Sequence, residues 1–154
     1  MKNVRMGFVA LVAVVALLWS GMGMVGVASD IDLSGNRFIT SNDTFWNVIG
    51  STNDNLPRGY TSWINLWATV TPQSVPTSCI VKNCSNPFSG EVGGHIVFDS
   101  SYVKPKKAGI DAVYIFPICK SCNHYRRLNG MTIQDNASFT AVKLKNYCLH
   151  NRCE

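Results

Sequence analysis

The stretch from Cys79 to Arg127 decides the fold, because it carries two cysteine pairs separated by strand-like sequence. The first pair bounds Cys79-Ile-Val-Lys-Asn-Cys84, and the second bounds Cys119-Lys-Ser-Cys122. The apolar run Ala112-Val-Tyr-Ile-Phe-Pro-Ile118 predicts a strand that leads directly into the second pair. One pair in a tight turn and one at the start of a helix form a known metal geometry, in which four sulfurs converge on one tetrahedral ion.

The N-terminal region introduces a second interpretation of these cysteines. Lys2 and Arg5 precede a long uncharged run that ends at Ser29, with small residues near its end, which is typical of a signal peptide over residues 1–29. The run is also long enough to cross a bilayer, so an uncleaved N-terminal anchor is the alternative. The chain is therefore expected to be secreted or extracytoplasmic, or membrane-anchored if it is not cleaved. Exported cysteines usually pair as disulfides, either within local loops or across elements.

Length and charge set further limits. The chain has 154 residues, enough for the signal peptide and one mature domain over residues 30–154. Its net charge of +5 falls to about +3 without Lys2 and Arg5, which does not by itself indicate nucleic-acid binding. All six cysteines follow residue 78, so the N-terminal half must be held together by packing. Cys148 and Cys153 repeat the spacing of the first pair and are expected to form a disulfide.

The remaining sequence predicts a small number of elements. Residues 41–49 are expected to form a brief helical turn, and residues 120–129 a short helix that Gly130 ends. From residue 60 to 70, large apolar side chains recur at helical spacing, which indicates a helix with Thr61 or Ser62 as its cap. Its aromatic stripe is expected to pack in the core, with a carbohydrate-binding platform as the alternative. Residues 139–145 alternate as a half-exposed strand does.

Residues 79–127 resemble the ββα-metal unit of the HNH endonucleases, a treble-clef type of zinc fold. The resemblance rests on the two cysteine pairs, on Gly94-His95-Ile96 between them, and on Asn123 directly after the second pair. It implies a structural zinc ion, His95 as the general base that activates water, and Asn123 as a ligand of a second, catalytic divalent metal, with His124 as a substitute. The zinc ligands that it implies are Cys79, Cys84, Cys119 and Cys122. The acidic residue or histidine that the family carries before its catalytic histidine is replaced here by Gly94.

Together these features predict an exported α+β protein, in which a small cysteine-rich ββα unit is joined to an N-terminal packing segment. Because the catalytic set is incomplete, the leading hypothesis is a non-catalytic binding or structural module with a protein or other extracellular partner. The alternative is a secreted metal-dependent nuclease that acts on nucleic acid through His95 and Asn123. A small secreted toxin or effector is a third hypothesis. The choice between zinc and disulfides stays open at this point.

Overall fold

A computed structural model of the chain describes residues 31–51, 54–84, 92–104, 112–124, 129–145 and 147. The expected signal peptide and the Cys148–Cys153 pair lie outside these residues. Within the described ranges, no helix has the length and apolar character needed to cross a membrane.

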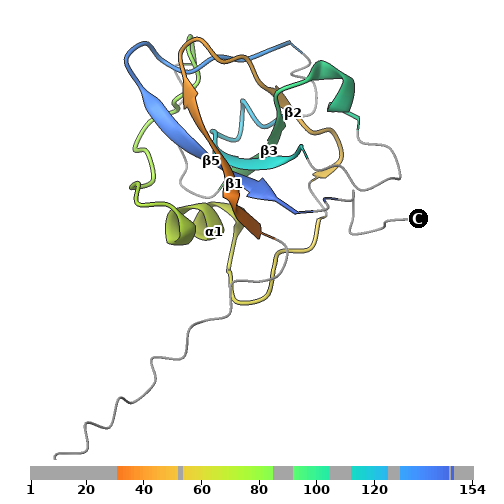
Figure 1. The fold of residues 1–154 in the computed structure, drawn as a ribbon. Helices are drawn as coiled ribbons and strands as arrows, with labels where there is room; N and C mark the ends of the chain where they lie inside the picture. The colour runs from red at the N-terminus through yellow and green to blue at the C-terminus, as the bar shows by residue number, and fades with distance from the viewer. Residues whose placement is uncertain are drawn as a thin grey trace, which may run out of the picture.

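A five-stranded sheet forms the centre of the fold (Figure 1). Its strands are β1 (Ile31–Thr40), β2 (Trp46–Asn47), β3 (Gly93–Val97), β4 (Tyr114–Pro117) and β5 (Ser138–Leu144). They lie in the order β1-β5-β4-β3-β2, and each neighbouring pair is antiparallel. The expected mixture of sheet and helix is confirmed, but the described residues do not show a treble-clef ββα unit.

The single α-helix among the described residues, α1 (Trp63–Val70), packs against β3 and β4. The Ser62 hydroxyl accepts a hydrogen bond from the Asn65 amide at 3.1 Å and so begins the helix as an N-cap. Trp67 is fully buried, and its indole Nε1 donates to the carbonyl oxygen of Thr140 on β5 at 2.6 Å. The predicted helix and the core role of Trp67 are therefore confirmed.

A glycine allows α1 to approach the sheet closely. A Cβ atom at Gly93 would lie 2.5 Å from the carbonyl carbon of Trp63 and 2.7 Å from the amide nitrogen of Ile64. Both contacts are with helix backbone, which cannot rotate away as a side chain can. The start of α1 thus rests directly on the first residue of β3.

The predicted helical turn over residues 41–49 is wrong. Ser41 and Asn42 form a turn, and the chain then continues through Phe45 into the short strand β2. Phe45 exchanges two backbone hydrogen bonds with Met131, at 2.9 and 2.8 Å. The N–H and C=O groups of Phe45 are therefore not available for hydrogen bonds within a helix. The long-range pairing therefore prevails over the local helical pattern.

Two other expectations also differ from the structure. Within the predicted helix over residues 120–129, the described part at 120–124 forms turns and irregular chain, while residues 125–128 lie outside the described ranges. The β5 strand is mostly buried instead of half-exposed, because side chains on both of its faces are covered: Thr140, Ala141, Val142 and Leu144 are all buried.

Candidate metal centre

The first cysteine pair lies in a compact turn between α1 and β3. The Cys84 amide donates to the Val81 carbonyl oxygen at 3.2 Å, and Asn83 adopts a left-handed conformation with φ of 62°. Asparagine tolerates this conformation better than most residues, so the chain can reverse between the two cysteines. The turn brings Cys84 back toward Cys79.

The segment that precedes β5 holds this turn in place. Val81 and Ile133 form an isolated antiparallel bridge, and the Gln134 amide donates to the Ile80 carbonyl oxygen at 2.9 Å. The Gln134 side chain also donates, through Nε2, to the Cys79 carbonyl oxygen at 2.8 Å. These contacts join the turn to residues about 50 positions away in sequence.

The second cysteine pair follows the end of β4. Two residues after Pro117, the chain turns through Cys119 and Cys122, and the Asn123 amide donates to the Cys119 carbonyl oxygen at 2.9 Å. The hydroxyl of Ser121 lies 3.1 Å from the Cys119 sulfur. Cys119 and Cys122 are both buried.

A buried asparagine on β2 fastens the second turn. The Asn47 Nδ2 atom donates to the carbonyl oxygen of Cys122 at 2.5 Å. Asn47 pairs with Ile96 in the sheet, so this bond ties the turn to the edge of the sheet beside β3. The other amide atom, Oδ1, is buried and finds no hydrogen-bond partner among the described residues.

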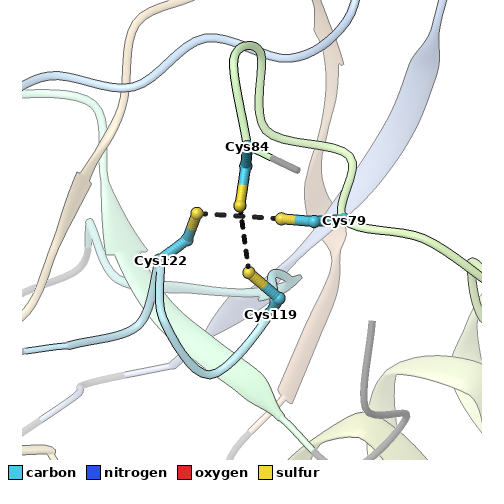
Figure 2. Close-up of side chains that lie close together, drawn as sticks. All are labelled: Cys79, Cys84, Cys119 and Cys122. Carbon is cyan, nitrogen blue, oxygen red and sulfur yellow. Dashed lines mark hydrogen bonds between the residues drawn. The ribbon is translucent and has the colours of Figure 1, made fainter. Parts of the chain in front are cut away.

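The two turns bring four sulfur atoms together from opposite sides, as Figure 2 shows. The Sγ atoms of Cys79 and Cys122 lie 3.7 Å apart, those of Cys84 and Cys119 lie 3.5 Å apart, and all four lie within 4.8 Å of one another. None of these cysteines is joined in a disulfide within the described chain. A zinc ion with Zn–S bonds of about 2.3 Å would place its tetrahedral ligands about 3.8 Å apart. This four-cysteine centre could therefore hold a metal ion.

The electrostatics of the centre favour a bound cation. The pKa of Cys79 is lowered to about 4, first by its hydrogen bond with Cys122, with backbone hydrogen bonds to Val81 and Cys119 also contributing. The pKa of Cys122 is raised by its bond to Cys79 and by burial, and that of Cys119 is raised by burial and by Cys79. Without a metal ion, the thiolate form is thus favoured at Cys79 and disfavoured at Cys119 and Cys122. A divalent cation among the four sulfurs would stabilise the charged form of all four.

The structure does not bring the predicted catalytic residues together. A Cβ atom at Gly94 would lie 2.9 Å from the Asn123 Oδ1 atom, which places Asn123 against one face of β3. The ring of the next residue, His95, packs edge-on against Trp63 at 4.5 Å between centroids, on the α1 side. Because successive residues of a strand point to opposite faces, the side chains of His95 and Asn123 lie on different sides of β3. His124 is exposed.

His95 instead belongs to a buried polar cluster that the sequence did not reveal. The Tyr147 hydroxyl donates a hydrogen bond to Asp54 Oδ2, and the His95 Nε2 atom lies 3.6 Å from the same oxygen. The three residues come from a loop, from β3 and from the segment after β5. No sequence pattern links three positions so far apart in the chain. Only His95 was singled out from the sequence, as a histidine next to apolar residues of a strand.

The described residues thus form an antiparallel sheet with one α-helix and a four-cysteine centre. No protein-family model matches the sequence, and no curated protein or solved structure matches it either.

Proposed function

We propose that the chain is an exported, non-catalytic binding or structural module, in which the four-cysteine centre holds one structural zinc ion. The observation that carries this proposal is the convergence of four sulfurs within 4.8 Å of one another. Cysteine can fill all four tetrahedral positions, and a zinc site closed in this way has no position for water or substrate. Such a site stabilises a fold and does not perform hydrolysis.

The position of the centre supports a structural role. The first turn is bonded to the segment before β5 through Gln134, and the second is bonded to β2 through Asn47. A metal ion shared by both turns would link these distant parts of the chain. Small exported domains with modest cores commonly need a cross-link of this kind.

The nuclease alternative receives less support. Its general base, His95, is almost completely buried and lies on the opposite face of β3 from Asn123. A base that activates water for attack on phosphate must share a site with the metal that binds this phosphate. We expect the purified protein to leave DNA and RNA intact in the presence of Mg²⁺ or Mn²⁺, and metal-dependent cleavage that His95→Ala abolishes would favour the nuclease instead.

The metal proposal is tested by elemental analysis of the protein and of two serine variants. Cys122→Ser removes a ligand of the four-cysteine centre, and we expect it to lose the zinc. Cys148 is not one of the four cysteines that define this centre, so Cys148→Ser is the matched control and should keep one zinc ion per chain. Equal zinc content in both variants, or no zinc in the unmodified protein, would contradict the proposal.

A further inference from the structure

The sulfurs of the four-cysteine centre form two close pairs, each of which spans the two turns. The Sγ atoms of Cys79 and Cys122 lie 3.7 Å apart, and those of Cys84 and Cys119 lie 3.5 Å apart. Each pair takes one sulfur from the first turn and one from the second, and together the pairs use every sulfur once (Figure 2). The sulfurs of a disulfide lie about 2.05 Å apart, so each pair needs to approach by only about 1.5 Å to become one.

Contacts outside the centre hold both turns in place. The Gln134 side chain donates to the carbonyl oxygen of Cys79, and the Asn47 side chain donates to that of Cys122. These hydrogen bonds end on backbone oxygens and not on sulfur, so they do not depend on whether the sulfurs bind a metal ion or one another. The two turns therefore stay opposed, and their sulfurs stay close enough to react across the centre.

Cys84 is the most accessible of the four cysteines. It is half-buried, whereas the other three are at most 1% exposed. The hydroxyl of Ser121, an exposed residue, lies 3.8 Å from the Cys84 sulfur and 3.1 Å from that of Cys119. The pair of Cys84 and Cys119 is therefore the one that a reagent in solution reaches first, while Cys79 and Cys122 form the inner pair.

We propose that the centre is also redox-active, so that a small-molecule disulfide oxidises it, zinc leaves, and the disulfides Cys84–Cys119 and Cys79–Cys122 form in its place. The inference rests on the proposed function, because it starts from the zinc-bound centre. The reaction takes place at sulfur and needs no open position on the metal. The new disulfides join the same two turns that zinc joins, so an exported chain keeps this link in both reducing and oxidising surroundings.

The exchange balances in atoms and electrons. The Cys84 thiolate attacks one sulfur of the small-molecule disulfide, a bond forms between the two, and the other half of the reagent leaves as a thiolate. The Cys119 thiolate then attacks the Cys84 sulfur, which forms the protein disulfide and releases the second half of the reagent. The inner pair reacts with a second reagent molecule in the same way. Two reagent molecules thus take four electrons from four thiolates, and the products are two protein disulfides, four small thiolates and one Zn²⁺ ion.

Disulfide mapping after oxidation tests this exchange. The zinc-bound protein is incubated with oxidised glutathione, the released zinc is followed with a chromophoric chelator, and the alkylated protein is digested with trypsin for mass spectrometry. Trypsin cleaves after Lys82 and after Lys120, so each of the four cysteines lies on its own peptide and every pairing gives a distinct mass. We expect one zinc ion to be released per chain, with the two proposed disulfides as the products. The first glutathione adduct trapped at short times should lie on Cys84.

A double variant, Cys148→Ser with Cys153→Ser, is the matched control, because it removes the other two cysteines and should give the same two disulfides. Zinc that stays bound after oxidation, a first adduct on another cysteine, or any other pairing, such as Cys79–Cys84, would overturn the exchange and leave the zinc proposal standing. The absence of zinc before oxidation would overturn both proposals.

Discussion

Replacing Asn47 by leucine tests whether β2 supports the four-cysteine centre. Asn47 is not a metal ligand, but its Nδ2 atom donates to the Cys122 carbonyl oxygen, which belongs to the second cysteine turn. Leucine has the same branched shape and the same number of side-chain heavy atoms as asparagine but bulkier methyl groups, so the change removes the hydrogen bond without opening a cavity. The four sulfurs themselves are left unchanged.

The expected magnitude follows from the two polar atoms that the variant loses. Removing the Asn47 donor from the buried Cys122 carbonyl costs about 1–3 kcal/mol. Removing Oδ1, which is buried without a partner among the described residues, offsets part of that cost. We therefore expect the unfolding free energy to fall by about 1 kcal/mol. The zinc dissociation constant should rise about 10- to 100-fold, because the bond orients a ligand turn.

Competition with a chromophoric zinc chelator measures the affinity, and urea unfolding measures the stability. The matched control is Thr71→Val, which removes another buried oxygen without a described partner, at the end of α1. It should leave zinc affinity unchanged and stability equal or slightly higher. Unchanged zinc affinity in Asn47→Leu, with the same stability loss in the presence and absence of chelator, would refute the positioning role.

Three further predictions concern the core. Gly93→Ala places a methyl group 2.5 Å from Trp63 backbone and should destabilise the fold by about 3 kcal/mol in urea unfolding; a loss below about 0.5 kcal/mol would show that α1 shifts freely. Trp67→Phe removes the indole bond to the Thr140 carbonyl and should cost about 2 kcal/mol in the same assay, whereas unchanged stability would mean that the bond contributes nothing. Burial lowers the pKa of His95 to about 3, so the unfolded chain binds a proton that the native chain does not between about pH 6.5 and pH 3. Stability should therefore decrease by up to about 2 kcal/mol as the pH falls to about 5, and His95→Gln should remove most of that slope; equal slopes would contradict this reasoning.

The elements with strong local patterns were predictable from sequence. The helix near residues 60–70 and the strand within residues 112–118 follow from apolar periodicity, and the structure places α1 and β4 there. β2 was not predictable, because its two residues carry no periodic pattern and owe their conformation to pairing with β3. The segment before it has a helical pattern, but the backbone of Phe45 bonds to Met131 instead.

The candidate site was predictable only in part. Cysteine spacing identified the four sulfurs, because each pair lies within one short turn. Nothing in the sequence indicated that Asn47 and Gln134 support the cysteine turns. Asn47 bonds to Cys122, 75 positions away in sequence, and Gln134 bonds to Cys79, 55 positions away. The two faces of β3 separate His95 from Asn123, and this separation depends on how the strand is placed between α1 and the second cysteine turn.

The intact mass of the purified protein under native and denaturing conditions, together with thiol counting, tests most directly whether the four cysteines hold zinc. We expect one zinc ion in the native mass, lost on denaturation, with the thiols of Cys79, Cys84, Cys119 and Cys122 becoming reactive only then. A native mass without metal, in which these four cysteines are joined as two disulfides, would contradict this expectation.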